Sequence, residues 1–196
     1  PRFYDVDGGR VFLDGVDVRD VKLVELRRAV GIVFEETFLF HDTVAANIAF
    51  ADGDADQGQI ERAARLAGAH EFIRELPGGY GTVVGERGFS LSGGQRQRLA
   101  IARALVRKPG IFLFDDSFSA LDLATDARLR AALAPRTSDT VVIIVAQRVS
   151  TIAGADQILV LEDGCCVGLG SHDDLLATCP TYVEIVASQQ AQGAVA

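Results

Sequence analysis

The chain reads Leu91-Ser92-Gly93-Gly94-Gln95, and RQRLAIARAL follows directly over residues 96–105. A serine and two glycines at the start of an apolar-periodic helix leave backbone N–H groups accessible. The helix dipole adds partial positive charge at the same end, so the segment suits a phosphate chain. The alternative is an ordinary capped helix, with Ser92 as the N-cap and Gly93-Gly94 in the preceding turn.

Length and composition indicate one globular domain. The 196 residues are 48% hydrophobic and 23% charged, and the formal net charge of −8 argues against a nucleic-acid surface, which needs a basic stripe. No apolar run approaches the roughly 20 residues that span a bilayer. The chain contains no methionine and begins Pro1-Arg2-Phe3-Tyr4, which indicates a processed chain or a fragment.

The order of apolar segments predicts an α/β fold. Continuous apolar strands that alternate with helices are typical of a parallel sheet covered on both faces. The expected strands are residues 9–14, 29–34, 111–114, 140–146, 157–161 and 165–167, with turns at Asp14-Gly15 and Asp163-Gly164. The expected helices are residues 23–28, 43–48, 59–67, 69–76, the helix after Gln95, 124–134, 171–177 and 182–190, and the tail 189–196 is expected to fray.

Two carboxylates follow the strand at 111–114. A buried strand that ends in Asp115 and Asp116 places charge in the ligand crevice of an open α/β sheet. One aspartate can hold Mg²⁺, and the next can orient or deprotonate an attacking water. A strand that ends in a solvated turn is the simpler alternative, but Ser119-Ala120-Leu121-Asp122 follows at once and favours the first interpretation.

Taken together, these motifs resemble the nucleotide-binding domain of ABC exporters. The resemblance runs from Arg2 to about Ser188. The motifs that support it are Gly85-Glu86-Arg87-Gly88 before Leu91, Asp115-Asp116 with Ser119–Asp122 after the strand at 111–114, and Gln147–Ile152. It implies a P-loop NTPase (RecA-like) parallel sheet with a helical signature subdomain at about 52–107, and a core at 1–51 and 108–196. The segments that resemble the exporter branch specifically are Thr82–Gly88, Phe38-Leu39-Phe40 and Thr43–Ile48.

The resemblance also assigns roles to residues. It implies that Leu91, Ser92, Gly93, Gly94 and Gln95, with Asp122, bind ATP held by a second nucleotide-binding domain. It places Asp115 and Glu35 at Mg²⁺, and Asp116 and Gln147 at the catalytic positions of the chain's own site. Arg96, Arg98 and Arg103 are expected to solvate or brace the helix rather than bind ligand.

The sequence departs from the family pattern in two ways. It contains no G-x-x-x-x-G-K-[ST] loop, and in the family that loop precedes the Arg2-Phe3-Tyr4-Asp5 segment, so we expect an N-terminal truncation that removes the P-loop strand and helix. That strand would lie between the strands at 140–146 and 157–161. Glutamate, histidine and glutamine of the family are replaced by Asp116, Gln147 and Glu35, which favours a degenerate site that binds ATP but hydrolyses it slowly.

Three functions stay open at this point. The first is the ATP-driven motor domain of an exporter at the cytoplasmic face of the cell membrane, paired with a second nucleotide-binding domain in a heterodimer and joined to transmembrane domains upstream. The others are a soluble ABC ATPase that acts on DNA or chromosomes, and a non-hydrolysing ATP sensor. The first predicts no nucleic-acid partner, and predicts that the chain alone is inactive.

Overall fold

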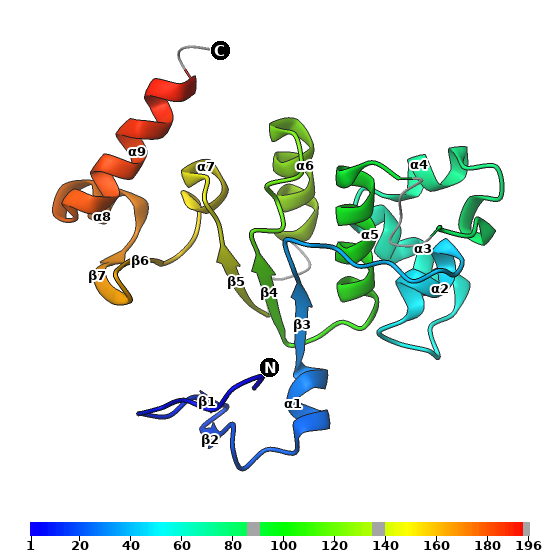
Figure 1. The fold of residues 1–196 in the computed structure, drawn as a ribbon, viewed down its shortest axis with the longest axis horizontal. Helices are drawn as coiled ribbons and strands as arrows, with labels where there is room; N and C mark the ends of the chain where they lie inside the picture. The colour runs from blue at the N-terminus through cyan, green and yellow to red at the C-terminus, as the bar shows by residue number, and fades with distance from the viewer. Residues whose placement is uncertain (86–90, 135–139, 194–196) are drawn as a thin grey trace. The chain divides into compact units, whose positions relative to one another are not determined.

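The computed structural model describes residues 1–85, 91–134 and 140–193. Contacts divide the chain into two compact units, Pro1–Val145 and Ala146–Ala196, and each is described by itself. Figure 1 shows their elements in chain order. Residues 86–88 of the exporter-like segment, and the tail beyond Gly193, lie outside the described residues.

The first unit begins with a small hairpin. Strands β1 (Phe12–Leu13) and β2 (Val16–Asp17) pair antiparallel around Asp14 and Gly15, whose φ angles of 49° and 78° are left-handed. Glycine takes this conformation at no steric cost, and aspartate tolerates it. Helix α1 (Leu23–Ala29) follows.

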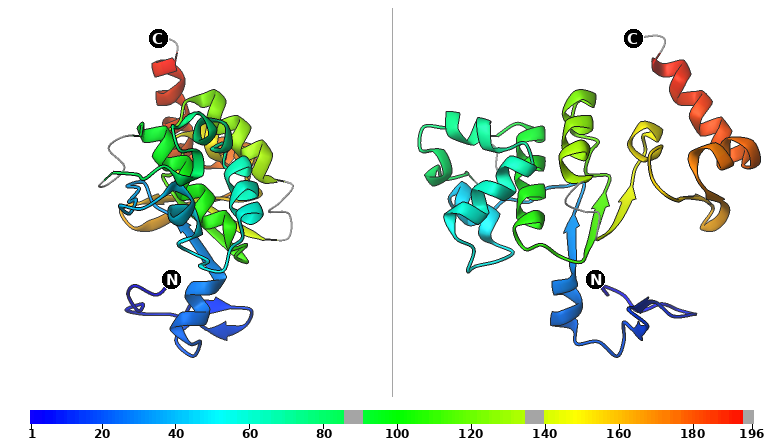
Figure 2. Two further views of the ribbon diagram at one scale, coloured as in Figure 1. Left: turned by 90° about the vertical axis from the view of Figure 1, so that its right-hand side faces the viewer. Right: turned by 180° about the vertical axis from the view of Figure 1, so that it is seen from behind.

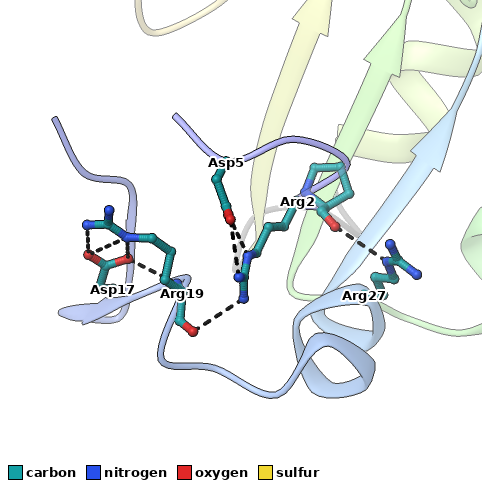
Figure 3. Close-up of polar contacts among 6 residues, drawn as sticks. Arg2, Asp5, Asp17, Arg19 and Arg27 are labelled. Carbon is teal, nitrogen blue, oxygen red and sulfur yellow. Dashed lines mark hydrogen bonds and ion pairs between the residues drawn. The ribbon is translucent and has the colours of Figure 1, made fainter. Parts of the chain in front are cut away.

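Charged side chains join the hairpin region to its surroundings (Figure 3). Arg2 pairs with Asp5, and its guanidinium also donates to the carbonyl of Arg19. The guanidinium of Arg19 pairs with Asp17 at 2.7 Å, and the backbone N–H of Arg19 donates to the same carboxylate at 3.0 Å. These contacts lower the pKa of Asp17 to about 2, chiefly through the side-chain hydrogen bonds from Arg19.

A parallel sheet forms the centre of the first unit. Its strands lie in the order β3 (Val30–Val33), β4 (Ile111–Asp115) and β5 (Val141–Val145). Val33 is paired with Phe114, and Asp115 with Val145, so all three carboxyl ends reach the same edge of the sheet.

Helices cluster on the β3 side of the sheet, where α5 packs against β3, α2 and α3 (Figure 2). A continuous apolar core joins these helices to β4, with Leu39, Ile48, Ile73, Leu99 and Ile101 fully buried. The helices of this unit after β3 are α2 (Val44–Ala49), α3 (Gln57–Leu66), α4 (His70–Glu75), the 3₁₀ turn η1 (Gly79–Gly81), α5 (Gly93–Val106) and α6 (Leu123–Leu133), of which α6 lies above β4 in Figure 1.

The second unit contains a hairpin and three helices. Strands β6 (Ile158–Glu162) and β7 (Cys165–Gly170) pair antiparallel, and helices α7 (Val149–Ile152), α8 (His172–Thr178) and α9 (Pro180–Gly193) complete the unit. Its core is small and includes Ile158, Leu175 and Tyr182. The Tyr182 hydroxyl lies 2.8 Å from Nδ1 of His172, which stands in the first turn of α8.

The structure confirms the predicted elements and the parallel sheet, and it corrects three expectations. Strand β5 is not buried: Val141, Ile143 and Val145 are about half exposed, so their face of the strand is only partly covered, and among the described residues of its unit β5 pairs with a strand on one edge only. Helix α9 continues to Gly193, past the expected start of fraying at Gln189. The short helix α7 was not expected.

Across the described ranges, no helix has the length and apolar character needed to cross a membrane.

Candidate functional site

Helix α5 begins with a capping box. Ser92 is the N-cap, and its Oγ accepts the N–H of Gln95 at 3.2 Å, while Oε1 of Gln95 accepts the N–H of Ser92 at 2.9 Å. Gly93 and Gly94 are therefore the first two residues of the helix and do not lie in the turn before it. The serine and the glutamine fix each other's orientation, which prepares this end of the helix.

The two glycines carry the accessible N–H groups. Within the part of the chain that the structure describes, the N–H groups of Gly93 and Gly94 have no acceptor. Space around Gly93 is open, with only the tip of Arg96 at 4.0 Å from where a Cβ would lie. The corresponding position at Gly94 lies 3.4 Å from the carbonyl oxygen of Ala120. A side chain at Gly94 would extend toward that oxygen, and a side chain at Gly93 would extend into the open space.

The contact at Gly94 brings two sequence motifs together. Ala120 belongs to Ser119–Asp122, and Leu121 of that segment packs in the same core as Leu91. Because Leu91 is buried, its backbone and not its side chain faces any ligand. Its carbonyl accepts a hydrogen bond from Arg96 at 2.7 Å, and Arg98 reaches the carbonyl of Gly68. These arginines brace the start of α5, as expected.

Asp122 has a clear local role. It is the N-cap of α6, where its carboxylate accepts the N–H of Thr125 at 2.9 Å and the Thr125 hydroxyl at 2.7 Å. The side-chain and backbone hydrogen bonds from Thr125 lower the pKa of the Asp122 carboxyl. The side chain is exposed and anionic, so a ligand would reach it through a hydroxyl or amine rather than through phosphate.

Asp115 and Asp116 stand at the carboxyl end of β4, as predicted. Asp115 is exposed, and Asp116 has a left-handed φ of 43°. Backbone hydrogen bonds hold this conformation, because the N–H of Asp116 donates to Val145 at 2.9 Å and its carbonyl accepts the Ser119 hydroxyl at 2.8 Å. The buried Ser117 hydroxyl donates to the carbonyl of Val33 at 2.6 Å and so ties this turn to the end of β3.

Glu35 lies in the loop that follows β3. Because β3 and β4 are parallel and in register to Val33 and Phe114, Glu35 emerges at the same sheet edge as the two aspartates. Its carboxylate is exposed and, among the described residues, makes no hydrogen bond or ion pair. Gln147 belongs to the second unit, where its backbone carbonyl accepts the side-chain amide of Gln189 at 2.6 Å.

The acids at this edge suit Mg²⁺ better than a metal that needs a full protein cage. No group of three or more potential ligands gathers in the described segments. Mg²⁺ is commonly held by one or two carboxylates and completed by water and substrate phosphates. Asp115 and Glu35 supply two exposed carboxylates at one sheet edge, so the donor set fits a magnesium–phosphate complex.

Two side chains of α5, Gln97 and Arg103, connect the site to the fold; sequence reasoning did not single out Gln97, and it expected Arg103 to brace the helix without identifying its partners. Gln97 is buried and bonds to Phe34 and Thr37, on either side of Glu35. Arg103 donates to the carbonyls of Phe38 and Asn47, and burial lowers its pKa to about 10. The sequence shows only a polar side chain on an apolar helix, which is a weak signal for a contact of this kind.

The comparisons with known proteins agree with this geometry. The family model described as ABC transporter matches residues 2–119. This chain belongs to the ABC transporter family. It is similar to an ATP-dependent lipid A-core flippase of Vibrio vulnificus (strain YJ016), with 48% identity over 98% of the chain, and to the putative multidrug export ATP-binding/permease protein YgaD of Bacillus subtilis (strain 168), with 46% identity over 90%.

A solved structure of an ABC family member also matches. The chain resembles a bacterial Atm1-family ABC exporter with ATP bound, with a TM-score of 0.93 and 45% identity over 96% of the chain. The chain covers 33% of that protein, 33% of the flippase and 30% of YgaD. It thus spans about a third of the length of these relatives and has the fold of an ABC ATPase domain.

Proposed function

We propose that this chain is the ATP-binding motor domain of an ABC exporter. The observation that carries the proposal is the start of α5, where Ser92 and Gln95 cap each other and leave the N–H groups of Gly93 and Gly94 open to a phosphate chain. The relatives named as a flippase and as a multidrug export protein support transport across a membrane as the process that ATP hydrolysis drives. ATP and Mg²⁺ are the cofactors.

The partners follow from the same proposal. A second nucleotide-binding domain presents ATP to Leu91–Gln95, and transmembrane domains carry the transported molecule. The share of the relatives left uncovered by this chain supports such additional domains. The domain would then work at the cytoplasmic face of the membrane, with no nucleic-acid partner, in keeping with a net charge of −8.

We further propose that the two ATP sites of the dimer differ. Aspartate at 116 is one methylene shorter than glutamate, and Gln147 cannot take up a proton at neutral pH. Glu35 adds negative charge where Mg²⁺ and phosphate meet. The start of α5 is intact by contrast, so this chain would complete a catalytic site on its partner while its own site holds ATP and hydrolyses it slowly.

Paired variants in the complete transporter test both parts of the proposal. Ser92→Arg removes the capping hydroxyl and adds bulk, and Gly93→Asp adds a negative charge beside the open N–H groups, so the pair should abolish ATP hydrolysis. Asp116→Asn should leave most of the hydrolysis. Asp56→Arg with Gln57→Asp is the matched control, because Asp56 caps α3 in the same way but away from the site. If Asp116→Asn is as damaging as the first pair, the two sites are not different.

The 196-residue chain by itself is expected to bind ATP poorly and to show no measurable ATPase activity. Its sequence contains no G-x-x-x-x-G-K-[ST] loop to grip the β- and γ-phosphates. The measurement is steady-state phosphate release against a buffer blank. Release well above the blank that Asp116→Asn removes would contradict this expectation.

A further inference from the structure

The buried amide of Gln97 joins helix α5 to the loop after β3. Its side chain is 2% exposed, its Nε2 donates to the carbonyl of Phe34 at 3.1 Å, and its Oε1 accepts the hydroxyl of Thr37. Phe34 and Thr37 enclose Glu35 and Glu36, whose side chains are exposed. Gln97 thus holds both ends of a short loop that presents carboxylates at the edge of the sheet.

Other contacts hold the flanks of this loop but not its centre. On one side, Ser117 bonds to the carbonyl of Val33, and on the other, Arg103 bonds to the carbonyl of Phe38. Between these two points, the described hydrogen bonds to the loop come from Gln97 alone. The position of Glu35 therefore depends on where Gln97 lies.

Gln97 also lies near the open end of α5. It is five residues beyond Ser92, or about 7.5 Å along the helix axis at the usual rise per residue. Ser92 caps the continuous helix Gly93–Val106, and Gln97 lies in its second turn, so we expect a displacement at Ser92–Gln95 to carry Gln97 with it. Leaving the amide or its partners unbonded in the core would be costly, which keeps the loop attached during the movement.

We infer that Gln97 is a positioning residue that makes the Glu35 loop follow the start of α5. This inference rests on the proposed function. It means that nucleotide bound at Ser92–Gln95 changes the position of Glu35 in the chain's own site. Coupling of this kind requires a physical link that both ends can bias, and the hydrogen bonds of Gln97 are that link.

Hydrogen exchange in the complete transporter tests the link, with the slowly hydrolysed analogue ATPγS and Mg²⁺ as the probe. In the wild type, nucleotide should protect the amides of 92–97 and those of 34–37. In Gln97→Leu, which keeps similar volume without the hydrogen bonds, protection of 92–97 should remain and that of 34–37 should be lost. In Ser92→Arg with Gly93→Asp, both should be lost.

Conservative variants separate positioning from general loosening of the fold. Thr37→Val removes the hydroxyl that bonds Gln97 and should weaken the protection of 34–37, whereas Thr37→Ser keeps the hydroxyl and should restore it. His70→Leu is the matched control: His70 is also buried, its ring bonds to the Tyr80 hydroxyl at 2.8 Å, and none of its hydrogen bonds among the described residues reaches the loop, so the protection of 34–37 should survive.

The results that contradict the inference differ from the result that contradicts the proposed function. Undiminished protection of 34–37 in Gln97→Leu, or in the variant blocked at Ser92 and Gly93, overturns the inference, as does an equal loss in His70→Leu. If nucleotide fails to protect 92–97 in the wild type, the proposed function fails instead.

Discussion

At the scale of single residues, the backbone conformation of Asp116 bears on which acid can occupy this position. Its φ of 43° lies in the left-handed region, where aspartate is better tolerated than longer side chains. The hydrogen bonds to Val145 and Ser119 hold this conformation in place. A shorter acid at this position therefore suits the turn, while it shortens the reach of the carboxylate toward a water.

Asp116→Glu should exchange stability for activity. The added methylene extends the carboxylate, so ATP hydrolysis at the chain's own site of the transporter should rise. The left-handed backbone should cost up to about 1 kcal/mol of unfolding free energy. Steady-state ATPase assays and denaturant unfolding measure the two effects, with Asp163→Glu, at another left-handed aspartate in the β6–β7 turn, as the control for backbone cost alone. An unchanged ATPase rate would show that reach is not the limiting defect.

Asp17 should make stability depend on pH. Its pKa falls from 3.8 to about 2, mainly through the hydrogen bonds from the Arg19 side chain, so the folded state binds fewer protons than the unfolded state between these values. The stabilisation is then complete well above pH 4 and is lost as the pH falls toward 2. The difference in unfolding free energy between wild type and Asp17→Asn should shrink over this window. A difference that is constant with pH contradicts the assignment.

At the scale of elements, the same serine capping box serves two helices with different consequences. Ser92 caps α5 and Ser171 caps α8, and each accepts the N–H of the third helical residue at 3.2 Å. A helix N-cap is ordinarily a matter of stability. The two glycines after Ser92, with open space at Gly93, are what distinguish α5.

Ser92→Ala and Ser171→Ala should therefore cost similar stability but have unlike effects on activity. Each should lower the free energy of unfolding by about 1 kcal/mol, the usual loss for an N-cap serine. Only Ser92→Ala should slow ATP hydrolysis by the transporter, because its hydroxyl organises the end that meets phosphate. Denaturant unfolding and ATPase rates, measured on both variants, check this. An equal fall in ATPase rate for both would reduce Ser92 to a structural cap.

Local patterns predicted most elements, and tertiary contacts supplied what they could not. The start of α5, the strand before Asp115 and the turns at Asp14 and Asp163 depend on neighbouring residues, so the sequence reveals them. The hydrogen bond between Gln97 and Phe34 joins residues 63 positions apart, and no sequence pattern near Gln97 predicts it. The burial of Arg103 among Phe38, Asn47 and two aromatic rings likewise needs the fold.

At the scale of the whole molecule, β5 shows the limit of reading burial from hydrophobicity. Its sequence VVIIV predicts a strand inside a sheet, and it does pair in register with β4. Burial, however, depends on what covers a strand, and Val141, Ile143 and Val145 remain 49–56% exposed. Among the strands that the structure describes in its unit, β5 has a partner on one edge only, and an apolar strand with an unpaired edge is a template for association with another chain.

The 196-residue chain in isolation should consequently self-associate through β5. Ile143→Lys places a charge in the middle of the exposed strand, where it opposes pairing with another chain at little cost to a side chain already 49% exposed. Val11→Lys is the matched control, because Val11 is 50% exposed and lies outside the sheet. Sedimentation velocity over a concentration series should show large species for the wild type and for Val11→Lys, and fewer for Ile143→Lys. If both variants reduce association equally, net charge and not the β5 edge governs it. If the wild type stays monomeric, with β5 amides protected in hydrogen exchange, the strand edge is no hazard.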